Sequence, residues 1–417
     1  MSPHGGDPLP TTAPSHAHET LAAHLGRDSV QQGDRAHVVP DAVLVGASAA
    51  RALLGGALAQ ADASRWCCPH DGGGRWDEQA HALWERTAAR GFALPADPSW
   101  PGVGVHVLLE RGLVGSRGLV GGERPDAYAV GGVGALAWRL DLPALADLAR
   151  EGRALVLVPR VRRVAVEGFL PRWAGPHDLA LALRRPLREA GRDDGALPVV
   201  HELSGTALDA LCVPGRIGLC EALGRFGLWA LVPPDAKTVA WLRARCRDAR
   251  HVEAAPAAAQ AGPAEVTLRA EAARPRLLVL GEPVDDGAVR NVEGHEPLDV
   301  TEIVLGATLE QCRVAVETLR DRRVAPGVSL SVVPVTQRTL LHAVEEGLLA
   351  ELLRAGAVVA PPGDVPGPAR PGRLATRRGH PGDLLVSAPV ATASAVVGRL
   401  VDPESMRRQV PRTGRRF

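Results

Sequence analysis

The sequence of 417 residues is poor in several residue types, and each scarcity makes some classes of protein less plausible. It contains one lysine, Lys237, and its formal net charge is +1. A balanced charge gives no global reason to expect nucleic acid as a partner. No apolar run reaches the ~18 residues that a membrane span needs, and the first residues lack the apolar core of a signal peptide. We therefore expect a soluble, cytoplasmic protein that binds neither nucleic acid nor membranes.

Cysteine pairs with the spacing of a metal-binding or redox motif are also missing. None of the six cysteines has the Cys-x-x-Cys spacing of zinc sites and redox motifs. Cys67 and Cys68 are adjacent and His70 follows them, so a metal or redox site there is one hypothesis. The alternative, which we favour, is ordinary reduced thiols. The cysteines are Cys67, Cys68, Cys212, Cys220, Cys246 and Cys312.

Composition predicts four parts of the chain. Residues 1–19 are rich in Pro, Thr, His and Gly, and we expect a disordered tail there, with a helix beginning near Glu19. His16 and His18 could instead coordinate a metal ion together with Glu19. An Ala- and Pro-rich linker is expected at 251–262. We assign residues 20–262 to two interleaved domains, 263–405 to a third domain and 406–417 to a basic tail.

The second half of the chain alternates between strands and helices. Strands are predicted at 303–305, 330–333 and 357–359, with helices at 309–322 and 336–354. This alternation is typical of a parallel sheet that helices cover on both faces.

Four other segments have less regular patterns. A strand is predicted at 103–109, and two short strands, paired with each other, are predicted at 155–159 and 163–168. The Pro-, Gly- and Arg-rich segment 361–382 is predicted to be a loop. The glycine-rich turn at 131–134 could admit a small anion or allow close helix packing.

Several motifs are shared with one enzyme family. The run Glu-Ile-Val-Leu-Gly-Ala-Thr begins at Glu302, and the run Ser-Ala-Pro-Val-Ala-Thr-Ala-Ser-Ala begins at Ser387. Both resemble the C-terminal third of aconitases and of the large subunit of 3-isopropylmalate dehydratase. Gly-Val-Gly-Val-His-Val-Leu-Leu-Glu, beginning at Gly102, is similar to another motif of that family. The resemblance covers about residues 20–405.

The resemblance implies an α/β fold. It implies three α/β/α domains with mixed or parallel sheets around a central cleft, and no swivelling fourth domain. In split enzymes of the family a small subunit supplies that domain, so a small-subunit partner is an expectation. A small carboxylic acid is the substrate that the resemblance implies.

The cysteines that hold the family's iron–sulfur cluster have no counterparts here. The family's Gly-Ser-Cys-Thr-Asn-Gly-Arg is reduced to about Gly306-Ala307-Thr308, and its Pro-Gly-Cys-Gly-Pro-Cys corresponds to the segment 362–367, with Asp364 and Gly367 at the cysteine positions. Because a 4Fe-4S cluster of this type requires Cys thiolates, we expect no cofactor and no bound metal.

Candidate site residues follow from the same resemblance. The family's Asp-Ser-His-Thr motif falls on residues 123–126, its substrate-binding loop on 377–380, and its Asn-Met-x-x-Glu run on 221–225. His106 lies one residue from the position of a family histidine. As catalytic residues we predict His70, Glu123, Asp126, Asp364 and His380. As carboxylate-binding residues we predict Arg124, Arg373, Arg377 and Arg378, since guanidinium groups bind carboxylates bidentately.

Two functions remain open from the sequence. The first is a cluster-independent lyase or isomerase, similar to a hydratase or dehydratase, that acts on a small carboxylic acid in specialised metabolism. The second is a non-catalytic relative that binds a metabolite or a protein partner, because nearly every catalytic position of the family has changed.

Overall fold

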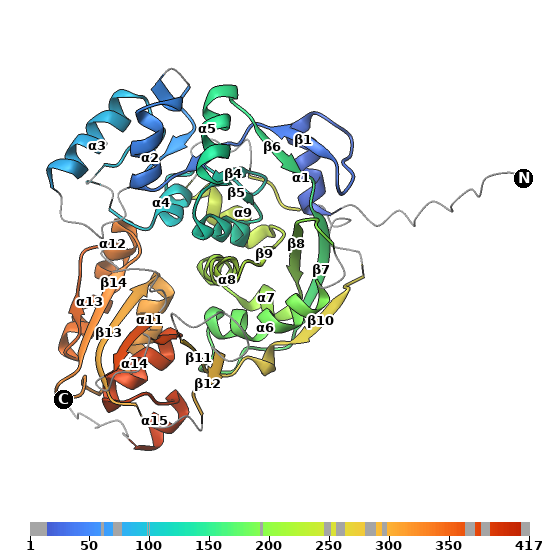
Figure 1. The fold of residues 1–417 in the computed structure, drawn as a ribbon. Coiled ribbons are helices and arrows are strands. Elements are labelled where there is room, and N and C mark those ends of the chain that lie inside the picture. Colours follow the sequence, from blue (N-terminus) through green and yellow to red (C-terminus); the bar gives the residue numbers. More distant parts are fainter. Residues whose placement is uncertain are drawn as a thin grey trace, which may run out of the picture.

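In the computed structural model of the protein, the structure describes residues 15–59, 62–69, 77–97, 99, 101–191, 195–245, 252–255, 263–279, 289–293, 298–362, 372–376 and 384–409. Three sheets of four or more strands organise this part of the chain (Figure 1). None of the described helices is long and apolar enough to cross a membrane.

The first sheet has four parallel strands in the order β3-β2-β4-β5. Val43 and Leu119 point into one core, whereas Leu44 and Val120 point into another, as the alternation of side chains along a strand requires. Helices therefore cover both faces. The strands are β2 (Ala42–Leu44), β3 (Trp66–Cys67), β4 (Leu119–Gly122) and β5 (Leu136–Arg139), and the helices are α2 (Ala47–Leu54), η1 (Ala57–Ala59), α3 (Glu78–Ala89), α4 (Gly104–Glu110), η2 (Pro125–Val133) and α5 (Leu142–Glu151).

The second sheet has four parallel strands in the order β10-β7-β8-β9. Its strands are β7 (Arg160–Glu167), β8 (Val199–Ser204), β9 (Trp229–Leu231) and β10 (Val266–Arg269), and its helices are α6 (Pro176–Ala190), α7 (Thr206–Ala210), α8 (Val213–Arg225) and η4 (Ala270–Ala272). Helix α9 (Ala236–Arg243) follows β9 in the chain but packs into a core of the first sheet through Val239 and Leu242. Helix α8 is buried along most of its length and lies near the centre of the molecule (Figure 1).

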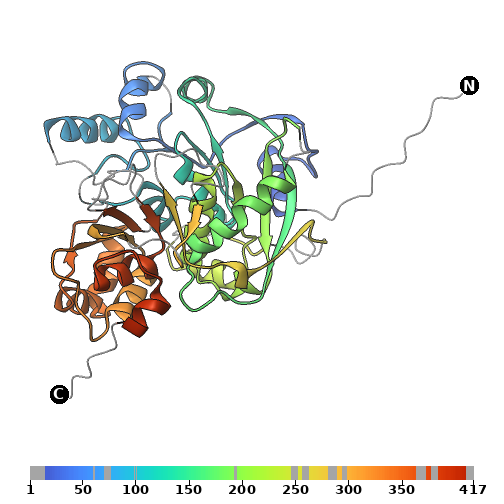
Figure 2. The ribbon, with the colours of Figure 1, turned by 60° about the horizontal axis from the view of Figure 1, so that its bottom comes forward.

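The third sheet has seven strands in the order β12-β11-β17-β16-β13-β14-β15. Its strands are β11 (Arg276–Val279), β12 (Val289–Asn291), β13 (Val300–Ala307), β14 (Ser329–Pro334), β15 (Val358–Val359), β16 (Gly372–Thr376) and β17 (Leu384–Val386), and its helices are α11 (Leu309–Leu319), α12 (Gln337–Glu345), α13 (Leu348–Arg354), α14 (Ala388–Val397) and α15 (Pro403–Gln409). Most of these elements form a lobe beside the rest of the chain, as Figures 1 and 2 both show.

The glycine-rich turn at 131–134 serves close packing. A Cβ atom on Gly132 would lie 2.3 Å from the backbone nitrogen of Ile217 in α8, and one on Gly131 would lie 2.1 Å from the carbonyl oxygen of Ala230. Only glycine permits this approach, so η2 contacts the backbones of α8 and β9 directly. The turn holds α8 in place.

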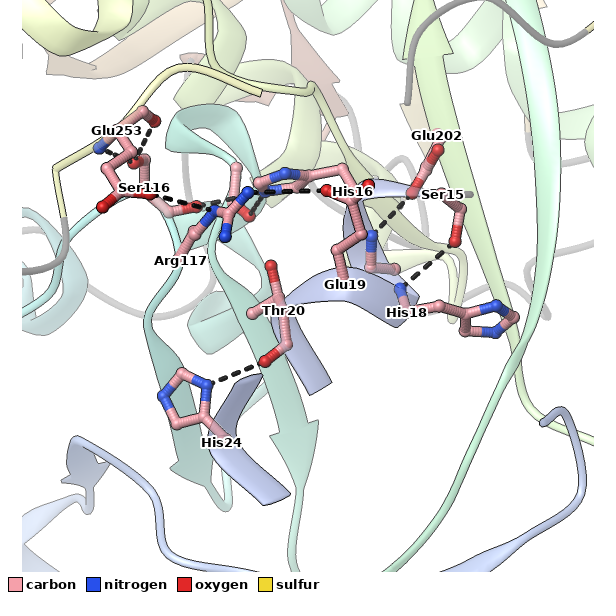
Figure 3. A network of polar contacts seen from close by, with 12 residues as sticks. Ser15, His16, His18, Glu19, Thr20, His24, Ser116, Arg117, Glu202 and Glu253 are labelled. Atoms are coloured by element: carbon pink, nitrogen blue, oxygen red, sulfur yellow. Dashed lines mark hydrogen bonds and ion pairs between the residues drawn. The ribbon is translucent and has the colours of Figure 1, made fainter. Parts of the chain in front are cut away.

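The predicted disordered tail is wrong for residues 15–19. Helix α1 (His16–Leu25) begins at His16, because the Ser15 side chain accepts a hydrogen bond from the His18 N–H at 3.2 Å. The imidazole Nε2 of His16 lies 2.8 Å from the Gly134 carbonyl oxygen, and that of His18 lies 2.8 Å from the Pro159 carbonyl oxygen. Figure 3 shows Ser15, His16 and His18 at the start of this helix. Both rings therefore bond to the backbone, which contradicts both a flexible tail and a metal site made by these two histidines.

Three strand predictions need correction. Residues 103–109 form helix α4, because its apolar residues are all buried and a fully buried run does not distinguish a helix from a strand. The strands near 155–159 and 163–168 do not pair with each other. Instead β6 (Ala154–Leu157) pairs with β1 (Arg35–Val38), and β7 joins the second sheet. These partners are distant in sequence, so local patterns could not identify them.

The third sheet is only partly parallel. Strands β13, β14 and β15 are parallel as predicted, whereas β16 pairs antiparallel with both β13 and β17. Strand β16 lies inside the predicted loop 361–382, where Pro and Gly flank a five-residue extended segment. The predicted helix 336–354 is two helices, since Gly347 has a left-handed φ of +72° that ends the first one.

Candidate active site

A cavity of about 350 Å³ lies between the second and third sheets, at the amino ends of four helices. These are α6, α8, α11 and α14, which come from segments far apart in the sequence. Residues at these helix ends that line the cavity are Gly175, Pro176, His177, Cys212, Pro214, Gly215, Thr308, Glu310, Gln311, Ser387, Ala388 and Pro389.

The four helix ends favour an anion in the cavity. Each α-helix carries about half a positive charge at its amino end, where backbone N–H groups lack partners within the helix. At α8 and α14 no side-chain hydrogen bond caps this end, whereas at α6 the Asp178 carboxylate accepts the Gly175 N–H at 2.9 Å. Each of these three helices has a proline in its first turn, at Pro176, Pro214 and Pro389, where the missing N–H costs nothing. Such ends are common carboxylate and phosphate sites.

His177 points to a ligand independently of the helix ends. Its side chain lines the cavity and is 5% exposed, and neither ring nitrogen has a hydrogen-bond partner among the described residues. Burial lowers the pKa of His177 to about 3, with a smaller contribution from the charge of Arg225. The ring is therefore neutral at physiological pH. Leaving such a group unpartnered costs about 1–3 kcal/mol, a cost that a bound ligand would offset.

A carboxylate between two basic groups lies in the same cavity wall. Glu221 Oε1 lies 2.9 Å from Arg225 Nη2, one helical turn along α8, and Glu221 Oε2 lies 3.6 Å from His106 Nε2 on α4. Glu221 is 6% exposed and His106 is also buried. His106 lies on helix α4 and lines the cavity next to Glu221.

A second cavity of about 230 Å³ adjoins the first. His106, Cys212, Pro214, Thr308, Glu310 and Val335 line both cavities. The second cavity continues between α4 and α9 on one side and α11 and α12 on the other. The two cavities are thus neighbours that share part of their walls.

The described residues that we predicted as catalytic lie outside both cavity linings. Glu123 Oε1 accepts a hydrogen bond of 2.8 Å from the Gly46 N–H, beyond the carboxyl ends of β2 and β4. Arg124 Nη2 lies 3.1 Å from Asp126 Oδ2. These three residues form one cluster, as their spacing suggested, but they do not line either cavity. Their catalytic role stays a prediction.

The remaining predicted site residues lie beyond what the structure describes. Arg373 belongs to β16, and its side chain is not described. The others outside the described residues are His70, Asp364, Arg377, Arg378 and His380.

Sequence reasoning overlooked His177 as a functional residue. The sequence feature that could have indicated His177 is the run His177-Asp178-Leu179, which resembles a motif of the aconitase family and follows a proline that starts a helix. That signal could not reveal burial without a partner, which requires the packed structure. Glu221 and Arg225 were recognised as replacements of family residues, but the ion pair between them was not anticipated.

The cysteines of the described chain do not form the ligand set of a cluster. Of the five described, Cys212 alone lines the cavity, whereas Cys312 is part of the core of the third sheet. Burial raises the pKa of the Cys67 thiol and of the Cys312 thiol to about 12. At the position of the lost family cysteine, Thr308 caps α11 by accepting the Gln311 N–H. No group of three His, Cys, Asp or Glu side chains suited to a metal occurs in the described residues.

Comparison with known proteins identifies the class of protein. The model of the aconitase family (aconitate hydratase) matches residues 74–273. The chain is 33% identical over 329 residues to the 3-isopropylmalate dehydratase large subunit of Nitratidesulfovibrio vulgaris, covering 72% of this chain and 75% of that protein. It is 31% identical to the corresponding subunit of Moorella thermoacetica, covering 79% of this chain and 82% of that one.

Two further comparisons are more distant. The homoaconitase large subunit of Thermus thermophilus is 30% identical over 73% of this chain and 75% of its own length. A crystal structure of Thermococcus kodakaraensis aconitase X is 14% identical, with a TM-score of 0.43, and covers 82% of this chain and 81% of that one.

The mixed α/β architecture is thus the aconitase-like fold that the sequence predicted. The chain belongs to the family of aconitases and 3-isopropylmalate dehydratase large subunits. Its named relatives are dehydratases and homoaconitase, which makes it a member of a hydro-lyase family.

Proposed function

We propose that the protein is a lyase or isomerase of the hydratase–dehydratase type that acts on a small carboxylic acid in the cavity at the four helix ends. One observation carries this proposal: a buried, unpartnered His177 faces a cavity on which the amino ends of α6, α8, α11 and α14 converge. A role in specialised metabolism stays a prediction from the sequence.

The cavity supports carboxylate binding in two ways. Backbone N–H groups and helix dipoles attract the negative charge, and the guanidinium of Arg225, which also lines the cavity, can donate hydrogen bonds to a carboxylate. A bound carboxylate beside His177 would supply the imidazole with the partner that the described residues do not provide.

Removal of water from a hydroxy acid requires two proton transfers. A base takes the proton from carbon as the carbon–carbon double bond forms, and an acid protonates the hydroxyl group that leaves as water. A bound carboxylate next to His177 would stabilise the protonated imidazole and raise its lowered pKa, which would suit the ring to the first role, and the pair of His106 and Glu221 is suited to the second. Positioned acid–base groups of this kind contribute about 10²–10⁴-fold to a rate.

We further propose that this chemistry proceeds without an iron–sulfur cluster. The family's three cysteine positions hold about Gly306-Ala307-Thr308, Asp364 and Gly367, and the described cysteines are dispersed. These side chains do not fit the thiolate requirement of such a cluster, so no step is assigned to one.

A protein partner is part of the proposal. The relatives from Nitratidesulfovibrio vulgaris and Moorella thermoacetica are named as large subunits. We propose that a small subunit also associates with this chain and covers the cleft. Co-expression with the product of an adjacent small-subunit-like gene, followed by size-exclusion chromatography, would detect the complex.

Proton abstraction can be tested without knowledge of the reaction direction. Purified protein is incubated in D₂O with a panel of hydroxy di- and tricarboxylates and their dehydrated counterparts, and NMR follows deuterium incorporation next to a carboxylate. We expect exchange with at least one compound and its loss in His177→Gln. A folded protein that exchanges and converts no compound of the panel would contradict the catalytic proposal.

The non-catalytic alternative is favoured by one observation. Glu221 and Arg225 stand where the family has an amide and a carboxylate, so the charges of this cavity wall are rearranged. A non-catalytic relative would bind carboxylates in the same cavity with no exchange. Calorimetric titration of the same panel separates this outcome from failure to bind.

A further inference from the structure

The second cavity is lined by apolar and cationic groups that the proposed reaction does not use. Leu109, Ile217, Leu309 and Val335 supply apolar walls next to the junction with the first cavity. Beyond them lie the polar residues Glu110, Trp241, Arg245, Arg313, Arg338, Thr339 and His342. Neither the comparisons nor the proposed proton transfers give this space a role.

The acidic groups of the second cavity are already balanced. Glu310 Oε2 lies 3.0 Å from Arg313 Nη1, and Arg313 also binds Glu346 through two nitrogens, one at 2.8 Å. Glu110 accepts a hydrogen bond of 2.8 Å from the Thr336 hydroxyl. Burial raises the pKa of Glu110 above that of an ordinary glutamate, against the opposing effects of the Thr336 hydrogen bond and the nearby arginines.

One guanidinium of the cavity is not directly bonded to a carboxylate. Arg338 is half-buried in the first turn of α12 and forms no hydrogen bond or salt bridge with any described residue, although its charge acts on Glu110. Arg245 is held in place, with its guanidinium carbon 3.9 Å from the centre of the Trp241 ring and Nη1 donating to the Trp241 carbonyl at 2.8 Å. A guanidinium that faces a cavity and has no hydrogen-bonded carboxylate is suited to an anionic ligand.

The junction between the cavities depends on the short turn after β13. Gly306 lines the first cavity, and Thr308 lines both. The Thr308 hydroxyl is turned back onto the first turn of α11, where it accepts the Gln311 N–H. The shortened turn therefore places a small, internally bonded side chain at the junction, and a ligand can extend from one cavity into the other.

We propose that the second cavity binds the far end of an extended dianionic substrate. Its head carboxylate lies at the four helix ends, an apolar linker passes Thr308 and Val335, and a second anionic group, a carboxylate or a phosphate, lies at Arg338. The position of the head rests on the proposed function, whereas the second anion site rests on Arg338 and its own cavity.

Binding of straight-chain dicarboxylates tests this proposal. Calorimetry measures the affinity of the full-length protein for succinate, adipate and suberate, and for an ω-phosphonocarboxylate of the same length as suberate. We expect one of the longer compounds to bind at least about tenfold more tightly than succinate, which corresponds to one additional charge-assisted contact. Comparison of the phosphonocarboxylate with suberate shows whether the second site prefers a phosphonate or a carboxylate.

Variants of Arg338 test whether the higher affinity for longer dicarboxylates arises in the second cavity. Arg338→Leu and Arg338→Gln should remove the length-dependent gain and leave succinate affinity within about twofold. The matched control is Arg354→Leu, on the neighbouring helix α13, where Arg354 is exposed and pairs with Glu351. Thermal unfolding verifies that each variant is folded.

Each outcome separates this inference from the proposed function. Equal affinity for all chain lengths, or a gain that persists in both Arg338 variants, would overturn the second site alone. Suberate binding that depends on Arg338 but not on His177, with no succinate binding, would support the second site and reject the proposed head-group site.

Discussion

At the scale of single residues, His177 is 5% exposed and has no hydrogen-bond partner in the described chain. Replacement by phenylalanine removes the desolvation cost of an unpartnered imidazole at similar shape. We therefore expect His177→Phe to increase the free energy of unfolding by about 1–3 kcal/mol and to abolish carboxylate binding. Urea unfolding and calorimetry measure the two effects.

A variant of a second histidine, His24, is the control for His177→Phe. His24 Nε2 lies 3.1 Å from Asp41 Oδ2, so its ring has a partner within the fold. His24→Phe should lower the stability and leave carboxylate binding unchanged. If His177→Phe destabilises the protein as much as His24→Phe does, His177 is a structural residue and its assignment to the site is wrong.

Glu202 gives a pH-dependent prediction at the same scale. Its Oε1 accepts the Ala17 N–H at 2.8 Å at the start of α1, and Figure 3 shows Glu202 next to this end of the helix. Burial raises the pKa of Glu202 from 4.5 to about 7, so the folded state holds a proton that the unfolded state has released between these values. This residue therefore lowers the stability as the pH rises from 4.5 through 7.

The variant Glu202→Gln isolates this contribution, because its amide oxygen can still accept the Ala17 N–H. We expect its stability relative to the wild type to increase by on the order of 1–3 kcal/mol between pH 4.5 and pH 7. Only the difference between the proteins is diagnostic, since burial lowers the pKa of His16 to about 4 and gives wild-type stability an opposite slope. A pH-independent difference would refute the titration of Glu202.

At the scale of elements, the loop before α6 bridges the two sides of the cavity. Arg172 and Trp173 line the cavity. Arg172 Nη2 lies 3.1 Å from Glu317 of α11, and the Trp173 Nε1–H donates to Glu404 of α15 at 3.0 Å. Both contacts are exposed, so they contribute little to global stability. Their position at the cavity wall suits a role in retaining the ligand.

We therefore expect Trp173→Ala to increase the dissociation rate of a bound carboxylate by about tenfold, with a small effect on the association rate. Stopped-flow displacement measures both rates. Phe169→Ala is the matched control, because Phe169 belongs to the same loop and its side chain is 75% exposed. Equal rates in the wild type and Trp173→Ala would show that the loop does not retain the ligand.

Local patterns in the sequence predict some of the individual helices and strands but not how they meet. Strands β13 and β14 and helix α11 were predicted in the right places, because each has its own apolar periodicity. Helix α4 was misassigned since its buried run carries no period. The site itself arises where four helix ends from distant segments meet, and no local pattern encodes that arrangement.

At the scale of the whole molecule, the final prediction concerns iron. The described cysteines lie in separate places, at the end of β3, along α8 and in the core of the third sheet, and burial raises the pKa of several of them. Protein purified without oxygen should contain far less than one iron and one sulfide per chain. Carboxylate binding and deuterium exchange should then be unaffected by air or by a chelator, because the proposed groups are imidazole, guanidinium, carboxylate and backbone N–H. Stoichiometric iron and sulfide, or an activity that oxygen destroys, would show that the chain holds a cluster and would contradict this prediction.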